Sequence, residues 1–363
     1  NIKHSIKIIM KLISFSCTTA KWSLKDFRPQ DLTLLVAKNA VGKSRTIDAV
    51  GYCVEMISQT EKRHRLFKYE GALSCAMTFE HNGEDFCYEF AYTAEHKVEK
   101  ETLTINVNTP SAKELLRRTA TSAQLHSANI APPAEKLVLH VRRDTKQYPY
   151  FELIVRWAEN ACTMTFNQLE VCDNMLKVSL PDMLAQLSDD NISEIMLQAQ
   201  QLGYPIEKIG VKVVAENNFA VFKEKDVSSE LAFINMSSGM YRSIYILILM
   251  HYLALRQMPS ILLIDDLCEG LDYHRSVLLG KMVCEYSKAN NIQLICASND
   301  NLLMQVIPLE NWTILLRHGE NVDCMDKWRY PELYRKFALT GLSNFDFFSS
   351  NFIERQLSMS QHE

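Results

Sequence analysis

The sequence predicts an α/β fold built on a parallel sheet, and three observations carry that prediction. Residues 32–36 (LTLLV) form a short apolar run rich in β-forming residues, which is typical of a buried strand. A loop containing Gly-Lys-Ser follows, and residues 46–56 then place apolar side chains at helical spacing. Residues 261–266 (ILLIDD) form a second apolar strand that ends in two acids. The carboxyl ends of parallel strands are where α/β proteins bind ligands.

The loop at residues 37–44 (AKNAVGKS) follows the pattern of a phosphate-binding loop, G-x-x-x-x-G-K-[ST], except at its first position. Successive N–H groups of such a loop point at an anion, Lys43 reaches the terminal phosphates, and Ser44 offers a hydroxyl to Mg²⁺. Ala37 and Ala40 stand where glycine is common, so we expect both to avoid the left-handed region. The alternative is a chance Gly-Lys-Ser sequence at the start of a helix.

Two acids and a capped helix complete the predicted site. Asp265 would hold Mg²⁺, directly or through water, and Asp266 would orient or deprotonate the attacking water. Residues 269–272 (EGLD) form an acidic turn into a further helix. Residues 235–242 (NMSSGMYR) precede a long apolar run, so their Ser-Ser-Gly sequence presents a helix N-terminus, which is a second anion site.

In this order and spacing, the motifs resemble those of the ABC-type ATPases of the SMC/RecF/OLD-like group, called AAA-family ATP-binding proteins in bacteria. The resemblance implies a P-loop NTPase fold, namely an ABC-type head with a mixed central sheet, an antiparallel β-subdomain and a helical lobe. The similar segments are Walker A at residues 37–44, the signature at 236–240, Walker B at 261–266, the D-loop at 269–272, and the last core strand and switch at 293–300.

The resemblance also implies ATP and Mg²⁺ as cofactors and assigns roles by position. Lys43, Asp266 and Asn299 take catalytic roles. Ser44 and Asp265 hold the metal. The nucleotide-binding positions are Asn39, Ala40, Val41, Gly42, Lys43, Ser44, Arg45, Ser237, Ser238, Gly239 and Asp272.

Besides Ala37, three positions depart from the family's pattern. Asp266 replaces the usual catalytic glutamate with a side chain that is one methylene shorter. Asn299 stands where a histidine is usual, so it cannot titrate near neutral pH, although its amide can still donate a hydrogen bond. Met240 replaces a polar residue of the signature. We therefore expect slow ATP hydrolysis, with ATP acting as a clamp.

Composition fits a cytoplasmic enzyme. The chain has 363 residues, of which 47% are hydrophobic, so it can fill a substantial core. The 10 cysteines show no C-x-x-C pair, which indicates reduced thiols and argues against a zinc site. Because the net charge is −4, binding of DNA or RNA would depend on local basic patches, such as residues 62–68. That cluster is more often a solvated helix face.

The first nine residues read as an extension, because Met10 begins a run (MKLISF) typical of the first strand of these heads. A signal peptide is the alternative, since Lys3 and Lys7 precede an apolar stretch. Lys11 interrupts that stretch, and no window approaches the ~18 apolar residues of a membrane span. We therefore expect no membrane partner.

The other elements follow from local patterns. Residues 75–80 and 85–92 should form a hairpin around Asn82-Gly83, with a third strand at 100–106. Residues 312–317 should form an edge strand, and the aromatic cluster at 345–348 should pack on the head or on a second subunit. No long heptad pattern appears, so an extended coiled coil is not expected.

The middle of the chain carries no motif. Residues 112–118 suggest a short helix that exposes Arg117 and Arg118. Residues 137–141 and 151–157 should form strands or short buried segments. We expect a helix at 182–202 and a strand at 211–222 with a turn at Asn217-Asn218. Gln124 and Gln147 are both weak candidates for the Q-loop glutamine.

We therefore divide the chain into an N-terminal ATPase lobe with Walker A and the β-subdomain (1–110), an inserted lid or helical lobe (111–230) and a C-terminal ATPase lobe (231–363). The resemblance implies a homodimer, or a higher homo-oligomer, that sandwiches ATP. It would switch a separate effector in DNA transactions or antiviral (phage) defence. The alternatives are a nucleotide-dependent scaffold with little hydrolysis and the nucleotide-binding subunit of a membrane transporter. The long insertion before the signature argues against the transporter.

Overall fold

A single large mixed sheet organises the molecule. The computed structural model describes residues 10–59, 71–164, 178–258, 260–298, 300–350 and 352–353. Asn299 and the basic cluster at residues 62–68 lie outside these ranges. The sheet has 14 strands in the order β10-β14-β15-β3-β16-β17-β2-β1-β4-β5-β6-β7-β8-β9, and three further strands, β11-β12-β13, form a small second sheet.

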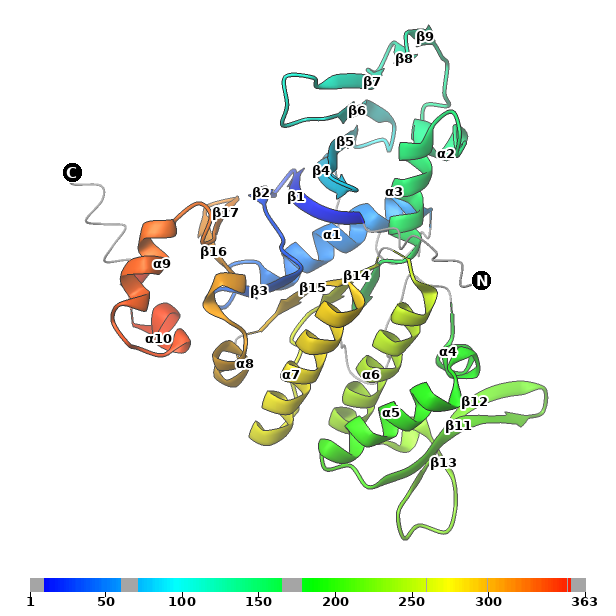
Figure 1. The fold of residues 1–363 in the computed structure, drawn as a ribbon. Coiled ribbons are helices and arrows are strands. Elements are labelled where there is room, and N and C mark those ends of the chain that lie inside the picture. The colour runs from blue at the N-terminus through cyan, green and yellow to red at the C-terminus, as the bar shows by residue number, and fades with distance from the viewer. Residues whose placement is uncertain are drawn as a thin grey trace.

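The first five strands of this order are parallel and form the centre of the fold (Figure 1). Leu34 and Val36 belong to the same apolar cluster as α6 and α7, whereas Leu35 belongs to the cluster that contains α1 and α3. Helices therefore cover both faces, which explains the continuous apolar runs of these strands. The elements are β10 (Cys162–Met164), β14 (Ser260–Ile264), β15 (Ile292–Ala297), β3 (Leu32–Val36), β16 (Trp312–His318), α1 (Lys43–Ser58), α3 (Pro149–Glu159), α6 (Ser238–Arg256) and α7 (Tyr273–Asn290).

The rest of the sheet is mainly antiparallel. The change begins at β17, which is antiparallel to β16 but parallel to β2. The predicted hairpin at Asn82-Gly83 is confirmed, with φ of 53° and 81° as a type I′ turn requires. The strands are β17 (Asn321–Met325), β2 (Trp22–Phe27), β1 (Met10–Thr19), β4 (Leu73–His81), β5 (Glu84–Tyr92), β6 (Val98–Ile105), β7 (Lys113–Arg118), β8 (Ala123–Leu125) and β9 (Ala128–Asn129).

A helical lobe packs against α6 and carries the small sheet, while the C-terminal segment packs beside β16. The ring of Phe347 contacts those of Tyr334 and Phe337, so the aromatic cluster packs on the head as predicted. The remaining elements are α2 (Val138–Val141), α4 (Leu180–Gln186), α5 (Asp189–Gln201), β11 (Ile206–Val214), β12 (Asn217–Glu224), β13 (Leu231–Ala232), η2 (Phe233–Asn235), α8 (Asn301–Val306), η3 (Leu309–Asn311), α9 (Pro331–Ala338) and α10 (Asn344–Ser349).

The helix predicted at residues 112–118 is wrong, because this segment is strand β7. β7 pairs with β6 and β8, and those partners override the local pattern. Arg118 is buried, not exposed, and its guanidinium donates to the carbonyl oxygens of Lys136 (2.6 Å) and Pro133 (2.8 Å). Arg117 is exposed as predicted.

Of the two alternatives for residues 137–141 and 151–157, short buried segments is the one confirmed, because they lie largely in helices α2 and α3; α3 begins at Pro149, where proline is favoured. Two other details differ from the sequence predictions. β16 is an interior strand, because both β3 and β17 pair with it. The β11–β12 turn lies at Ala215 and Glu216, one pair of residues earlier than expected. In the described ranges, no helix is long and apolar enough to span a membrane.

Candidate nucleotide-binding site

The predicted phosphate-binding loop joins the carboxyl end of β3 to α1. Gly42 is the N-cap of α1 with φ 131°, a conformation that favours glycine, and Lys43 is the first helical residue. Asn39, Ala40 and Ser44 are exposed, so the loop surface is open to a ligand. The strand, loop and helix stand in the order that the sequence predicted.

Ala40 contradicts one expectation, because its φ is 63°. The left-handed region costs a residue with a Cβ roughly 1–2 kcal/mol. The carbonyl oxygen of Ala40 accepts a hydrogen bond from Arg317 Nη1 at 3.2 Å, and this contact from β16 helps to hold the loop in that conformation. Ala37, in contrast, is buried and is not among the residues with positive φ.

Lys43, Ser44, Asp265 and Asp266 meet at the edge of the parallel strands. Lys43 Nζ donates to the carbonyl oxygen of Ala37 at 3.2 Å. Burial lowers the pKa of Lys43, and the charges of Asp266 and Asp265 oppose that shift. Ser44 donates a side-chain hydrogen bond to Asp265. Lys43 and the two aspartates are more than 200 residues apart in sequence, and the pairing of the parallel strands brings them together.

Both aspartates are partly buried, and burial raises the pKa of each. The Oδ1 atom of Asp265 is buried and has no hydrogen-bond partner among the described residues. A buried carboxylate oxygen without a donor fits a cation next to it. Asp265 and the Ser44 hydroxyl are oxygen ligands of the kind that Mg²⁺ prefers.

In the described ranges, no group of three or more His, Cys, Asp or Glu side chains is placed to hold a metal by itself. This agrees with the chemistry of Mg²⁺ at nucleotide sites, where one or two protein ligands are completed by water and phosphate oxygens. The residues present therefore fit Mg²⁺ bound together with a nucleotide.

The signature segment caps α6 and packs on the D-loop segment. Ser237 is the N-cap of α6 and accepts a hydrogen bond from the Met240 N–H at 3.4 Å. A Cβ on Gly239 would lie 3.0 Å from the carbonyl oxygen of Gly270, so any residue larger than glycine at this position would require its neighbours to shift. Ser237 and Ser238 are both exposed.

Arg242 is a residue of this site to which the sequence analysis assigned no role. Its guanidinium is buried and donates to the carbonyl oxygens of Asp266 (3.0 Å) and Glu269 (2.8 Å), and it contacts the Glu269 carboxylate at 3.2 Å. Arg242 thus ties the first turn of α6 to the end of the Walker B segment. An arginine at the start of an otherwise apolar helix was the available signal.

Asp266 has φ 50°, a left-handed conformation that aspartate tolerates better than most residues. Its carbonyl oxygen is the one that Arg242 binds, so this contact stabilises the sharp turn after β14. The backbone strain is therefore located at the residue predicted to act on the attacking water.

The D-loop residue Asp272 caps α7. Its carboxylate accepts from the Arg275 N–H at 3.0 Å and from Arg275 Nη1 at 2.6 Å, and the backbone bond is the main reason why its pKa is lowered. Two large apolar side chains lie exposed near these motifs, Ile234 (78% exposed) and Tyr273 (65%). The signature and D-loop side of the molecule is therefore open and partly apolar.

Arg45 and Val41 lie on the β16 and β2 side of the loop. The guanidinium of Arg45 lies over the Trp22 ring, 5.3 Å from its centroid. Val41 and Lys38 line a cavity of about 280 Å³ together with β16 and the C-terminal segment. Arg317 and His318 also line it, so its polar groups are basic.

The described structure does not support the Q-loop candidates and does not test the role of Asn299. Gln124 lies in β8 and bonds to Asn129, at the far end of the sheet order from β3. Gln147 lies beside the same strands, so neither glutamine is placed as a Q-loop residue. Asn299 is outside the described residues, and its catalytic role stays a prediction.

No protein-family model matches this sequence, and no curated protein matches it. Among solved structures, an Smc head bound to the C-winged helix domain of ScpA is similar with a TM-score of 0.51, at 11% identity over 86% of this chain and 96% of that chain. The Smc head with an extended coiled coil, bound to the C-terminal domain of ScpA derived from Pyrococcus furiosus, gives 0.52, at 9% identity over 91% and 100%.

At these identities the likeness concerns the fold alone. The fold is that of an ABC-type ATPase head of the SMC kind, with a mixed central sheet, an antiparallel β-subdomain and a helical lobe. The predicted fold class is therefore confirmed.

Proposed function

We propose that this chain binds ATP with Mg²⁺ and hydrolyses it slowly. The observation that carries the proposal is the convergence of Lys43 and Ser44 with Asp265 and Asp266 at one open edge of the sheet. The buried Oδ1 of Asp265, which has no hydrogen-bond partner in the described ranges, supports a cation at this place. Fold alone does not specify a reaction, so the argument is made from these residues.

In the proposed mechanism, the N–H groups of the loop and the N-terminus of α1 hold the phosphates, and Lys43 contacts the terminal ones. Mg²⁺, when bound to Ser44 and Asp265, would neutralise charge on the phosphate oxygens. Asp266 orients the attacking water and accepts its proton. Burial raises the pKa of Asp266 towards the working pH, which favours a general base, but its short side chain limits its reach.

We further propose that two copies sandwich ATP head to tail, with the signature of one copy completing the phosphate site of the other. Ser237 and Ser238 are exposed at a helix N-terminus, which suits a phosphate that another chain holds. Ile234 and Tyr273 supply exposed apolar surface on the same side. The proposal also includes the division of the chain into an N-terminal ATPase lobe (1–110), an inserted lid or helical lobe (111–230) and a C-terminal ATPase lobe (231–363).

A mixing experiment tests both the activity and the dimer. Lys43→Ala and Ser237→Arg should each be inactive, but a 1:1 mixture should regain about a quarter of the wild-type rate, because half of the dimers contain one intact site of two. The control mixture is Lys43→Ala with Asp266→Ala, in which both sites of every mixed dimer are defective. Recovery in the control, or none in the first mixture together with an unchanged mass in ATP, would refute the dimer.

We propose that the cycle switches a separate cytoplasmic effector in a DNA-transaction or phage-defence system, and that local basic patches contact DNA or RNA. A scaffold that binds ATP but scarcely hydrolyses it is the second candidate, favoured by the short Asp266 side chain and its left-handed backbone. If the wild type hydrolyses ATP faster than Asp266→Ala does, the protein is an ATPase. An equal rate, with ATP still bound, decides for the scaffold.

A further inference from the structure

Trp22, the first residue of β2, carries a buried hydrogen-bond donor that no described residue accepts. Its side chain is only 1% exposed, and its Nε1–H has no partner in the described ranges. A buried N–H without an acceptor is costly, because the hydrogen bond to water that it loses on folding is not replaced. A donor of this kind calls for an acceptor among its neighbours.

The donor lies next to the phosphate-binding loop. A Cβ built on Gly42 would lie 3.5 Å from Trp22 Nε1, and the next atom within reach, from Val322 of β17, would be 3.8 Å away. The guanidinium of Arg45 lies over the indole ring, 5.3 Å from its centroid, so the first turn of α1 packs on the same ring. The Nε1 atom is therefore held beside the backbone of Gly42, where the loop becomes helix.

The strands β16, β17 and β2 follow β3 in the sheet order (Figure 1) and support the loop from one side. Arg317 of β16 donates to the carbonyl oxygen of Ala40 in the loop at 3.2 Å. The Ser23 N–H of β2 donates to the carbonyl oxygen of Glu320 at 2.8 Å, so β2 is fixed to the turn that follows β16. Trp22 thus belongs to the same support as Arg317, which already binds a loop carbonyl.

Peptide geometry explains how the loop could use this second donor. A trans peptide group is planar, and its N–H and C=O bonds point in opposite directions. When the N–H groups of a loop turn towards a phosphate, the carbonyl oxygens of the same peptides therefore turn away from it, towards the supporting strands. Gly42, with φ 131°, allows this rotation without a clash of a Cβ atom.

We infer that Trp22 is a positioning residue for the phosphate-binding loop. As ATP binds, the Trp22 Nε1–H donates to a backbone carbonyl of the loop next to Gly42 and holds the loop N–H groups on the phosphates. Trp22 acts through the loop and does not contact the nucleotide, because Nε1 is covered by protein atoms. The inference rests on the proposed ATP site. A neutral hydrogen bond gained on binding is worth about 3- to 10-fold in affinity.

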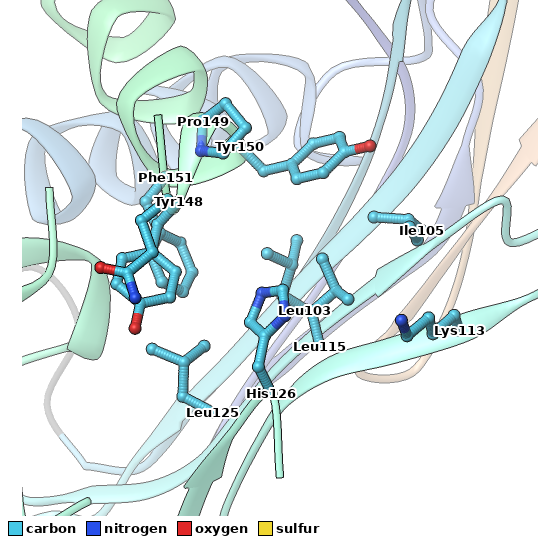
Figure 2. Close-up of a pocket in the computed structure, with 11 residues that line it drawn as sticks. Leu103, Ile105, Lys113, Leu115, Leu125, His126, Tyr148, Pro149, Tyr150 and Phe151 are labelled. Atoms are coloured by element: carbon cyan, nitrogen blue, oxygen red, sulfur yellow. The ribbon is translucent and has the colours of Figure 1, made fainter. Parts of the chain in front are cut away.

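Trp157 of α3 is a matched comparison within the chain. Its side chain is also buried, and its Nε1–H likewise has no partner among the described residues. α3 ends shortly before β10, and Asn160 donates to Met258 Sδ, just before β14, at 3.5 Å. Trp157 therefore lies near the amino ends of the parallel strands, on the opposite edge from the loop. Figure 2 shows the other end of α3, at Pro149, across a cavity from β6, β7 and β8.

The first test is NMR of the full chain labelled with ¹⁵N-tryptophan, which gives four indole N–H signals. Trp22→Phe and Trp157→Phe assign two of them, since each variant lacks one signal. On addition of ATP and Mg²⁺, the Trp22 proton should move downfield, the direction that hydrogen bonding causes. The signals of Trp157 and of Trp312, whose Nε1 already donates to the Ile307 carbonyl oxygen at 3.1 Å, should stay in place.

The second test is ATP affinity. Replacement of Trp22 by benzothienylalanine keeps the shape of the ring but puts sulfur in place of the N–H group, so it removes the donor without leaving a cavity. It should weaken the binding of a fluorescent ATP analogue by about 3- to 10-fold. The same replacement at Trp157 should leave the affinity unchanged.

Three results would overturn the inference: a Trp22 signal that does not move at saturating ATP, an unchanged affinity after the replacement of Trp22, or equal losses of affinity at both positions. In each of these cases ATP still binds, so the proposed ATP site stands. If the wild type binds no ATP at all, the proposed function is refuted and this inference with it.

Discussion

Two carboxylates, one in each half of the sheet, share a pKa that burial raises but differ in their partners. Glu101 of β6 is fully buried, and burial raises its pKa. It accepts from the Tyr88 hydroxyl at 2.8 Å and from the Val138 N–H at 2.8 Å, and Arg118 lies 3.5 Å away. Burial also raises the pKa of Asp265, but its Oδ1 has no partner among the described residues.

The difference shows that a shifted pKa alone does not identify a ligand site. Glu101 is satisfied within the chain and fixes the start of α2 against β6, which is a structural role. Asp265 keeps an oxygen at the open edge of the parallel strands that no described residue satisfies, and a ligand there can complete it. The unmet hydrogen-bonding capacity, rather than the titration, separates the two.

The largest expected effect is on stability in the antiparallel half. Glu101→Ala should lower the free energy of unfolding by about 3–5 kcal/mol. It leaves the buried Arg118 guanidinium without a carboxylate partner, and the Val138 N–H loses its hydrogen-bond acceptor. Urea unfolding measures the change. The control is Glu99→Ala, an exposed acid on the same strand, for which about 0.5 kcal/mol or less is expected. Equal losses in the two variants would show that the Glu101 cluster is not structural.

The next effect is on ligand binding in the parallel half. Lys43→Ala should weaken ATP binding by roughly 10- to 100-fold, the usual value of a hydrogen bond to a charged group. It should leave the unfolding free energy nearly unchanged, because burial already disfavours the Lys43 charge. Titration with a fluorescent ATP analogue measures the affinity. Lys281→Ala, an exposed lysine on α7, is the control. Normal ATP affinity in Lys43→Ala would remove this loop from the site.

The same contrast explains which parts of the structure the sequence could predict. Strands β3 and β14 are buried on both faces, so their continuous apolar runs and the motifs after them are visible locally. The hairpin at Asn82-Gly83 is also a local signal. The four residues that carry the proposed chemistry come from these segments, and the structure brings them together.

The failures occurred where distant residues decide the conformation. β7 is a strand because β6 and β8 pair with it, and the burial of Arg118 depends on carbonyl groups 15 and 18 residues further along the chain. The left-handed Ala40 bonds to Arg317, 277 residues away. The contacts of Arg242 likewise lie 24 and 27 residues away. No local pattern encodes such partners.

A smaller effect separates the two carboxylates directly. A folded-state pKa raised by burial means that the group's contribution to stability is present below its unfolded pKa and is lost as pH rises through the folded pKa. Removal of the charge by Asp265→Asn should therefore stabilise the nucleotide-free protein at pH 7–8 by about 1 kcal/mol. Glu101→Gln should destabilise it, because the amide loses the charge that pairs with buried Arg118 and the second oxygen that accepts from the Val138 N–H.

Binding should change in the opposite sense. Asp265→Asn should weaken Mg²⁺ binding in the presence of ATP, and Glu101→Gln should not. In the wild type, Mg²⁺ affinity should fall on acidification at a higher pH than for a solvated aspartate of pKa about 3.9, because protons compete more strongly for Asp265. Thermal unfolding and Mg²⁺ titration at several pH values measure both. Stabilisation by Glu101→Gln, or none by Asp265→Asn, would contradict the comparison.

The smallest effect concerns the backbone of the phosphate-binding loop. Ala40→Gly should raise the unfolding free energy by at most about 1 kcal/mol, because glycine adopts φ 63° without strain but also gains freedom in the unfolded chain. Ala37→Gly is the matched control and should lower it by a similar amount, since Ala37 is buried and is not left-handed. Thermal unfolding of both variants gives the sign. If Ala40→Gly destabilises as much as Ala37→Gly, the contact from Arg317 removes the strain at Ala40 completely, and the alanine is as well suited to the loop as glycine would be.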